Sequence, residues 1–224
     1  MAIVLFSGGQ DSTTALLWAV RHLPGPWQAL SFAYGQRHAV ELTAAQTIIQ
    51  RLALSGLSHT ILSIGELWQN LAVPSALTQA LPIEQGPSGL PSTFVPGRNL
   101  IFLTLAAIWG YARQDYTLVI GASQVDYSGY PDCREGFLQA AEKTLQEALE
   151  QPIRIIAPFL YWDKAQLWRY ADELGYKEFI AEHTHTCYLG DRTKRHPWGY
   201  GCGSCPACLL RRKGYEQAFA NFVS

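Results

Sequence analysis

The sequence predicts an α/β protein with a Rossmann-like fold, in which a five-stranded parallel sheet carries helices on both faces. Three observations lead to this fold class. Apolar runs of strand length alternate with segments whose apolar residues recur at helical spacing. The alternation repeats, so helical crossovers join consecutive strands and make them parallel. The first apolar run also passes directly into a glycine-rich turn and a helical segment.

The predicted strands are residues 3–6, 27–34, 58–63, 116–121 and 153–157. The predicted helices are residues 15–20, 41–52, 100–109, 137–149 and a segment that follows Asp163. The first strand is apolar throughout, which is typical of a parallel strand buried on both faces. Asp163 is the expected cap of the last helix.

The turn after the first strand, residues 7–14, reads Ser-Gly-Gly-Gln-Asp-Ser-Thr-Thr. Gly8 and Gly9 permit a positive φ and a close approach of the backbone to a ligand. The amides that open the next helix present donors to an anion, so a phosphate is the expected guest. Asp11, Ser12 and Thr13 offer oxygens to a metal ion or hydrogen bonds to the phosphate, although an Asp or Ser at this place could equally be only a helix cap. The turn lacks the Walker and dinucleotide patterns, and it resembles the PP-loop of enzymes that split ATP between its α and β phosphates.

Length, composition and charge exclude several classes of protein. With 224 residues, of which 48% are hydrophobic, the chain is long enough for one sizeable core and too short for two large domains. A formal net charge of −1 disfavours a stable nucleic-acid partner, because such binding depends on neutralising phosphates. No apolar run is long enough to span a bilayer, and no leader-like segment precedes the first strand, so we expect a cytoplasmic protein without a membrane partner.

The expected organisation is one nucleotide-binding α/β domain, residues 1–182, followed by a C-terminal helical metal-binding segment, residues 183–224. Residues 70–97 contain five prolines and little periodicity. A structureless stretch of this length in a compact domain is typically functional or mobile, so we expect a lid here.

Two cationic residues are placed at predicted helix starts. Arg98 and Asn99 precede the apolar helix 100–109 and could bind a phosphate, or Asn99 could only cap the helix. Lys164 lies in the first turn of its helix, where the dipole disfavours a cation. An anionic ligand near Lys164 would account for its position.

The loop of residues 126–134 reads Asp-Tyr-Ser-Gly-Tyr-Pro-Asp-Cys-Arg, with two carboxylates and two tyrosines beside the expected sheet edge. Such residues can hold a planar heterocycle by stacking and by paired hydrogen bonds. Alternatively, the loop is a turn in which Asp132 caps the helix 137–149. Cys133 is expected to be an inert filler rather than a reactive thiol.

Four of the five cysteines, Cys187, Cys202, Cys205 and Cys208, form the pattern C-x14-C-x2-C-x2-C. Four thiolates at this spacing suit a tetrahedral structural zinc ion, which leaves no open position for water. An iron–sulfur cluster is the alternative. The neighbouring cations are expected to form a solvated or subunit-contacting face, and they are Arg192, Lys194, Arg195, Arg211, Arg212 and Lys213.

Taken together, these motifs resemble the QueC family of 7-cyano-7-deazaguanine synthases, within the PP-loop ATP pyrophosphatase superfamily. The similar stretches are residues 7–14, 34–37 with Glu41, 94–99, 126–134, 158–164, Cys187-Tyr188 and the final Cys-Gly-x-Cys-Pro-x-Cys. The resemblance implies an adenine nucleotide alpha hydrolase-like fold and a C–N ligase of queuosine biosynthesis. The implied reaction converts 7-carboxy-7-deazaguanine and ammonia, with ATP, into 7-cyano-7-deazaguanine (preQ0) through an adenylated carboxylate and an adenylated amide.

The resemblance also implies roles for individual residues. The cofactors would be ATP, Mg²⁺ and a structural Zn²⁺ ion on the four cysteines, and the protein would be a homodimer. Asp11 and Lys164 would be catalytic. The expected ATP-binding residues are Leu5, Phe6, Ser7, Gly8, Gly9, Gln10, Asp11, Ser12, Thr13, Arg98 and Asn99. The expected base-binding residues are Asp126, Tyr127, Ser128, Tyr130, Asp132 and Arg134.

Two other functions remain open from the sequence. A PP-loop tRNA thiolase would use the same ATP chemistry, but it needs an RNA-binding surface and a working cysteine such as Cys133. A non-catalytic nucleotide-binding zinc module would bind ATP and leave it whole.

Overall fold

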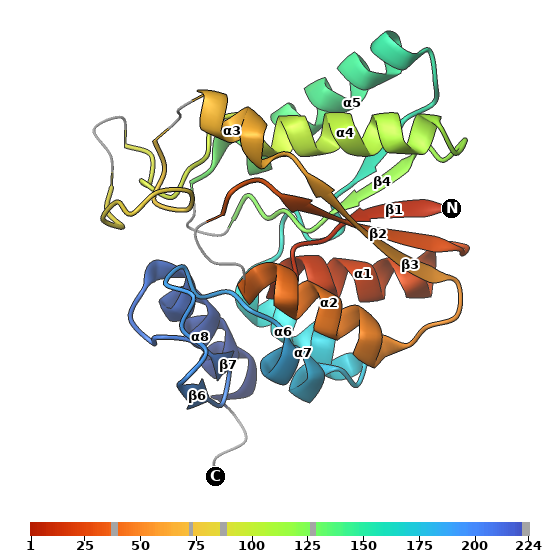
Figure 1. Ribbon diagram of the computed structural model, residues 1–224. Helices are drawn as coiled ribbons and strands as arrows, with labels where there is room; N and C mark the ends of the chain where they lie inside the picture. Colours follow the sequence, from red (N-terminus) through yellow and green to blue (C-terminus); the bar gives the residue numbers. More distant parts are fainter. Residues whose placement is uncertain (37–39, 72–73, 86–88, 126–128, 221–224) are drawn as a thin grey trace.

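The computed structural model describes residues 1–36, 40–71, 74–85, 89–125 and 129–220. Its central element is a parallel sheet of five strands in the order β3-β2-β1-β4-β5 (Figure 1). The strands are β1 (Ala2–Leu5), β2 (Trp27–Ala33), β3 (Leu57–Ser63), β4 (Thr117–Ile120) and β5 (Arg154–Ile156). The predicted fold class is confirmed, and the predicted strands agree with the observed ones to within two residues at each end.

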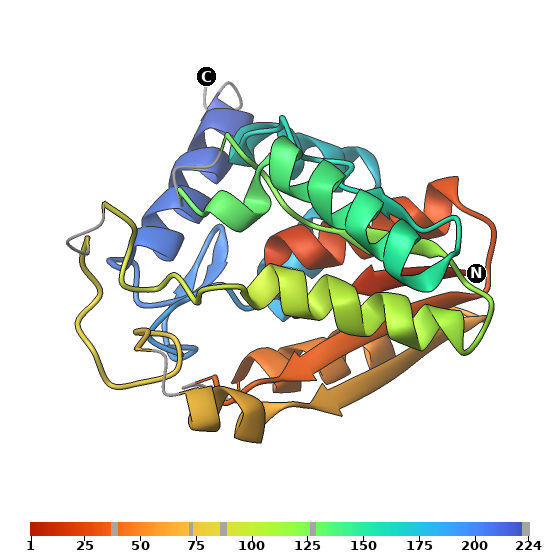
Figure 2. The ribbon, with the colours of Figure 1, turned by 90° about the horizontal axis from the view of Figure 1, so that it is seen from above.

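Helices cover both faces of the sheet, as Figures 1 and 2 show. On one face lie α3 (Gly65–Leu71), α4 (Arg98–Tyr111) and α5 (Glu135–Leu149). On the other lie α1 (Gln10–His22), α2 (Val40–Leu52) and α6 (Lys164–Glu173). The chain continues with α7 (Lys177–His183), a short antiparallel pair β6 (Arg195–His196) and β7 (Gly199–Tyr200), and α8 (Pro206–Phe219).

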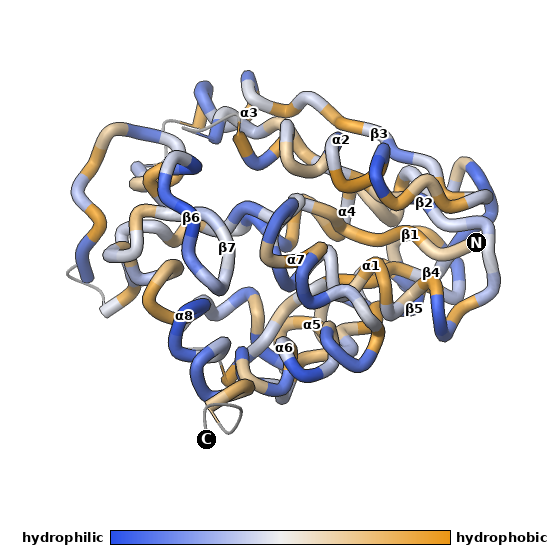
Figure 3. Tube along the Cα trace, turned by 90° about the horizontal axis from the view of Figure 1, so that it is seen from below, coloured by the Kyte–Doolittle hydropathy of each residue, from blue (hydrophilic) through white to orange (hydrophobic). Residues whose placement is uncertain are grey.

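Strand β1 explains why the sheet needs helices on both sides. All four of its residues are buried. Ile3 and Leu5 pack into the cluster beneath α4 and α5, whereas Val4 packs into the cluster beneath α1 and α2. Successive side chains of a strand point to opposite faces, so an apolar strand must be covered twice. Figure 3 shows the hydrophobic colouring of β1 and its neighbours in the middle of the molecule.

The C-terminal tail packs against the helices beneath the sheet. Trp168 of α6 is fully buried, and its Nε1 donates to the carbonyl oxygen of Arg211 in α8 at 3.3 Å. Arg211 was expected on a solvated face, and this is wrong: its side chain is 0% exposed. Its guanidinium donates to Thr186 Oγ1 at 2.8 Å and to the Ile180 carbonyl oxygen at 3.0 Å. Arg211 therefore fastens α8 to α7 and to the segment that follows it.

The segment expected to be a lid lies at the carboxyl end of the sheet, the same end as α8 (Figure 1). Its described parts contain an isolated bridge between Gln85 and Pro91. Ser75 is fully buried, and the amide of Ala76 donates to the Ser92 carbonyl oxygen at 2.8 Å. The hydrogen bond between Ala76 and Ser92 thus joins the first part of the segment to its last part.

Among the helices in the described ranges, none combines the length and the apolar character needed to cross a membrane.

Candidate active site

A cavity of about 280 Å³ opens at the carboxyl ends of β1, β2 and β4. The strand order reverses between β1 and β4, and open parallel sheets bind their ligands at such a switch point. The sequence-predicted residues that line the cavity are Leu5, Phe6, Ser7, Gly9, Gln10, Asp11, Ser12, Arg98, Asn99, Tyr130 and Lys164. Gly8, Thr13, Asp132 and Arg134, although within the described ranges, are not part of this lining. Asp126, Tyr127 and Ser128 lie outside the described residues.

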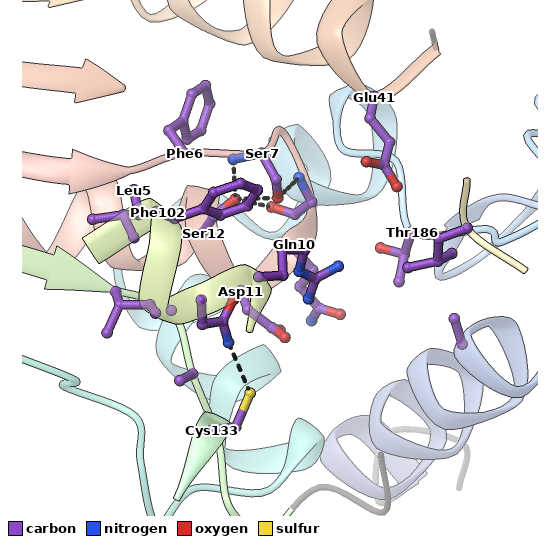
Figure 4. A pocket seen from close by; sticks show the side chains of 18 of the residues that line it. Leu5, Phe6, Ser7, Gln10, Asp11, Ser12, Glu41, Phe102, Cys133 and Thr186 are labelled. Carbon is purple, nitrogen blue, oxygen red and sulfur yellow. Dashed lines mark hydrogen bonds between the residues drawn. The ribbon is translucent and has the colours of Figure 1, made fainter. Parts of the chain in front are cut away.

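Serine side chains hold the turn at the start of α1 in shape (Figure 4). Ser12 Oγ accepts from the Ser7 amide at 3.2 Å and lies 3.0 Å from Ser7 Oγ. The Gly9 amide donates to Ser7 Oγ at 3.3 Å. Within the described part of the chain, no side chain caps α1 at Gly9. The first amides of α1 therefore remain available to an anion in the cavity.

The two loop glycines have different reasons to be glycine. Gly8 has a φ of +80°, and a Cβ atom there would lie 2.6 Å from the Ala45 amide nitrogen of α2. Gly9 has a φ of −79°, so it does not need the positive φ that the sequence permits. Gly8 thus allows α2 to approach the loop closely, and Gly9 is the glycine that faces the cavity.

Lys164 and Asp11 form a bidentate ion pair in the cavity wall. The ammonium Nζ lies 2.6 Å from each carboxylate oxygen, and the lysine side chain is 8% exposed. Asp163 caps α6 as predicted, because its side chain accepts from the Gln166 amide and Gln166 returns the bond. The cation in the first turn of α6 is therefore matched by an anion, the carboxylate of Asp11.

Asp132 accepts hydrogen bonds from Asn99 at the start of α4. The amide of Asn99 donates to Asp132 Oδ2 at 3.2 Å, and Asn99 Nδ2 donates to the Asp132 carbonyl oxygen at 3.0 Å. The alternative in which Asp132 caps the helix 137–149 is wrong, because α5 begins after Arg134. The alternative in which Asn99 caps α4 is also wrong, since Gly97 occupies that position.

Among the described residues that were predicted to bind the base, Tyr130 is the one that lines the cavity. Its hydroxyl lies 2.7 Å from Thr93 Oγ1 and 3.4 Å from the Tyr188 hydroxyl. Tyr130 therefore connects the end of the expected lid with the segment that carries Cys187, the first cysteine of the cluster. Arg134 is exposed and lies outside the cavity lining.

Sequence reasoning assigned no role to several cavity residues, among them Tyr34, Glu41, His185 and Tyr188. Burial raises the pKa of Glu41 to about 7, and the nearby guanidinium of Arg98 offsets only part of this effect. Burial also raises the pKa of Tyr34 to about 12. Tyr34 could have been found, because it ends a predicted strand at the ligand-binding edge of the sheet.

Cys133 stands at the cavity wall, where Asn99 Nδ2 lies 3.4 Å from its sulfur (Figure 4). Burial, reinforced by the carboxylate of Asp132, raises the pKa of the Cys133 thiol to about 11. The nucleophilic form of cysteine is the thiolate, so this thiol is unreactive at neutral pH. The predicted inertness of Cys133 agrees with this pKa.

The four predicted metal ligands converge. One sulfur atom from each of Cys187, Cys202, Cys205 and Cys208 lies within 4.8 Å of the others. The sulfur–sulfur distance is 3.9 Å between Cys202 and Cys208 and 4.0 Å between Cys187 and Cys205. Metal–sulfur bonds of about 2.3 Å in a tetrahedron require a sulfur–sulfur spacing of about 3.8 Å. The cluster therefore fits one tetrahedral metal ion.

Comparison with known proteins identifies the family. The family model described as queuosine biosynthesis protein QueC matches residues 1–219. The chain belongs to the QueC family. Proteins named 7-cyano-7-deazaguanine synthase are similar to this QueC-family chain over nearly its whole length. The protein from Bordetella pertussis is 48% identical over 96% of this chain and 91% of its own length. The protein from Methylibium petroleiphilum is 48% identical over 96% of this chain and 94% of its own length. The protein from Nitrobacter hamburgensis is 45% identical over 99% of this chain and 96% of its own length.

Proposed function

We propose that this QueC-family chain is a C–N ligase of queuosine biosynthesis that converts 7-carboxy-7-deazaguanine and ammonia, with ATP, into 7-cyano-7-deazaguanine. Its relatives carry the name of that synthase. The observation that carries the proposal in this structure is a single cavity that contains both the PP-loop with the Asp11–Lys164 pair and Tyr130 of the base-binding loop. An activating site and a site for a heterocycle thus share one space.

The chemistry requires activation before ammonia can react. An unactivated carboxylate resists ammonia because oxide is a poor leaving group. Adenylation places that oxygen on AMP, and pyrophosphate leaves. Ammonia then gives a primary amide, and a second adenylation of the amide oxygen allows that oxygen to leave with AMP as the nitrile forms. Each activation needs the same stabilisation of charge on the phosphates, so one loop can serve both steps.

Different residues of the chain would bind the phosphates, the Mg²⁺ ion and the structural metal ion. The amides at the start of α1 face the cavity and would bind the phosphates, with Arg98 and Lys164 as cations nearby. The Asp11 carboxylate and the Ser12 hydroxyl are hard oxygen donors of the kind that Mg²⁺ prefers. A bound Mg²⁺ ion would neutralise charge on the phosphates. The four cysteines would hold a structural Zn²⁺ ion, since their spacing leaves no open coordination position.

The organisation of the protein follows from the same proposal. Residues 1–182 would form the catalytic domain, and residues 183–224 the metal-binding segment. The segment 70–97 would act as a lid that keeps water from the adenylates. The contact between Thr93 and Tyr130 supports a lid that closes over the base. We further propose a cytoplasmic homodimer that acts on small molecules and holds no nucleic acid stably.

The tRNA thiolase alternative is disfavoured by Cys133. A thiolase needs a nucleophilic sulfur, whereas burial holds the pKa of the Cys133 thiol at about 11. The other described cysteines are grouped in the metal cluster. A Cys133→Ala variant should therefore keep its turnover and its metal content, whereas a thiolase would lose turnover alone.

The decisive experiment is incubation of the purified protein with ATP, Mg²⁺, ammonium and 7-carboxy-7-deazaguanine. Mass spectrometry of the products should find the nitrile, AMP and pyrophosphate, with two AMP formed for each nitrile. If neither nitrile nor AMP appears, the proposed function is wrong. ATP that binds and remains whole would instead favour the non-catalytic module.

A further inference from the structure

Gln10 has a buried side-chain amide without a partner. Gln10 is the first residue of α1, and it is 2% exposed. Neither Nε2 nor Oε1 has a hydrogen-bond partner among the described residues. Leaving such a group unpaired costs about 1–3 kcal/mol, so buried amides in folded proteins are normally paired.

Gln28 shows how this same fold treats a buried amide elsewhere. Gln28 is 6% exposed and lies in β2. Its Nε2 donates to the Ala29 carbonyl oxygen at 2.8 Å, and its Oε1 accepts from Ser58 Oγ at 2.8 Å. Both polar atoms of the Gln28 side chain form hydrogen bonds within the protein, whereas neither polar atom of the Gln10 side chain has a hydrogen-bond partner among the described residues.

The position of Gln10 indicates where that partner comes from. Gln10 lines the cavity next to Asp11, whose carboxylate is held by Lys164 (Figure 4). These neighbours form the part of the cavity in which the proposed activation takes place. The cavity is therefore the place from which a bound ligand would pair with the Gln10 amide.

The two polar atoms of Gln10 limit the chemistry of that ligand. Nε2 donates hydrogen bonds, and the adjacent Oε1 accepts them. Phosphate and carboxylate oxygens only accept, so they satisfy Nε2 and leave Oε1 unpaired. Ammonium only donates, so it satisfies Oε1 alone. A primary amide presents a carbonyl oxygen and an N–H group side by side, and it pairs with both atoms of Gln10 at once.

We propose that the side chain of Gln10 binds the primary-amide intermediate and retains it in the cavity between the two adenylation steps. This inference rests on the proposed function, because only that reaction forms an amide. Before the amide forms, Nε2 would hold the carbonyl oxygen of the acyl adenylate and Oε1 would hold the ammonia. The amide then inherits both hydrogen bonds from its two precursors.

The reaction balances with Gln10 as a binding group that exchanges no atoms. Ammonia attacks the carbonyl carbon of the acyl adenylate and forms the C–N bond of the amide, the C–O bond to AMP breaks, and one proton is released. The amide oxygen then forms a bond to the α-phosphorus of a second ATP, and pyrophosphate leaves. The nitrogen loses its two remaining protons as the C–O bond breaks, so that AMP carries the oxygen away and the nitrile remains.

The test measures how the amide partitions between release and further reaction. Variants Gln10→Leu and Gln10→Glu are compared with the wild-type protein, each supplied with the acid, ATP, Mg²⁺ and ammonium. Free amide and nitrile are quantified by mass spectrometry. Loss of one or two hydrogen bonds of about 1 kcal/mol each should raise the ratio of free amide to nitrile about 10-fold in both variants. The KM for externally added amide should rise about 10-fold, which is more than the rise in the KM for ATP.

Controls separate this proposal from loss of folding and from failure of the proposed function. Gln10→Glu is nearly isosteric, so it keeps the inference testable if Gln10→Leu does not fold. Gln28→Leu removes a buried amide outside the cavity lining and should leave the ratio unchanged. A wild-type ratio in both Gln10 variants overturns the inference, and so does an increase confined to the KM for ATP. Absence of nitrile from the wild-type protein overturns the proposed function itself.

Discussion

The ammonium of Lys164 lies 2.6 Å from both carboxylate oxygens of Asp11, which is 153 residues away in the sequence. Each residue belongs to the first turn of its helix, α6 for the lysine and α1 for the aspartate. The pair therefore fixes the distance between the two helix starts at the cavity wall. It also sets a cation beside the loop that we propose to bind phosphates.

Replacing Lys164 with methionine should abolish most of the activity. The substitution keeps the apolar length of the side chain but removes the charge that we propose to stabilise the phosphates. Loss of one such electrostatic group typically costs about 100- to 1,000-fold in rate. ATP–pyrophosphate exchange in the presence of the acid measures the first adenylation directly. Lys177→Met is the matched control, because Lys177 is also the first residue of its helix and its side chain is 30% exposed. Exchange by Lys164→Met at more than a third of the wild-type rate would contradict the role of Lys164.

A second prediction concerns Gly214, where α8 passes over the start of α6. A Cβ atom at Gly214 would lie 2.2 Å from Lys164 Cβ, so Gly214→Ala must push the lysine or the helix aside. Overpacking of this kind costs about 1–3 kcal/mol of stability. Because the displaced residue is Lys164, the adenylation rate should also fall, by about 10-fold or more for a displacement near 1 Å.

Gly110→Ala is the control for Gly214→Ala. A Cβ atom at Gly110 would lie 2.0 Å from the Asp115 carbonyl oxygen, near the end of α4 that is remote from the cavity. Urea unfolding should show a loss of stability in both variants. Exchange assays at a temperature where both are folded should show a loss of rate in Gly214→Ala only. An equal loss of rate in both would mean that stability alone explains the effect.

Much of the fold could be predicted because its signals are local. The apolar run 3–6 identifies a buried strand, and Asp163 followed by Gln166 three residues later identifies a helix start. The helix α8 was expected only as part of a helical segment without bounds of its own, since its apolar positions pack against α6 and the cysteine cluster rather than forming one periodic stripe. The burial of Arg211 was not predicted either, because its basic neighbours in the sequence suggested a solvated face.

The site was less predictable because its parts meet only in the folded chain. The PP-loop and the cysteines are short motifs with a fixed chemistry, so their residues could be named in advance. Glu41 and Tyr188 lie in stretches that resemble the family, but no residue pattern gives them a role, and they meet in the cavity only because the start of α2 and the cysteine segment come together in the folded chain. The sequence predicted Asp132 to bind the base or to cap α5. In the structure, its carboxylate accepts a hydrogen bond from the Asn99 amide at the start of α4.

Removing the metal site should destabilise the tail. Cys208→Ser removes one of four converging thiolates from a segment whose core includes the cysteines themselves. Binding of a structural metal is coupled to folding, so losing it should lower Tm by about 10 °C or more in a chain of this size. Metal content by elemental analysis should fall from the proposed one zinc ion per chain to substoichiometric values. Cys133→Ser, at a cysteine outside the cluster, should keep the metal and most of the Tm.

The last prediction concerns the pH dependence of stability through Glu41. Burial raises the pKa of Glu41 in the folded protein to about 7, from a reference value of 4.5, despite the guanidinium of Arg98 nearby. The folded state therefore holds this proton more tightly than the unfolded state does. The stabilisation from Glu41 is fully present below about pH 4.5, and it is lost as the pH rises through about 7.

Glu41→Gln removes this titration, because glutamine is a neutral mimic of the protonated acid. At pH 8 the variant should be more stable than the wild-type protein, by at most about 3 kcal/mol at about 1.4 kcal/mol per pKa unit. At pH 4.5 the two should unfold at nearly the same urea concentration. Glu178→Gln is the matched control, since Glu178 is also the second residue of its helix and its side chain is 76% exposed. If the gap between Glu41→Gln and the wild-type protein does not widen from pH 4.5 to pH 8, the pKa of Glu41 is not raised in the folded protein.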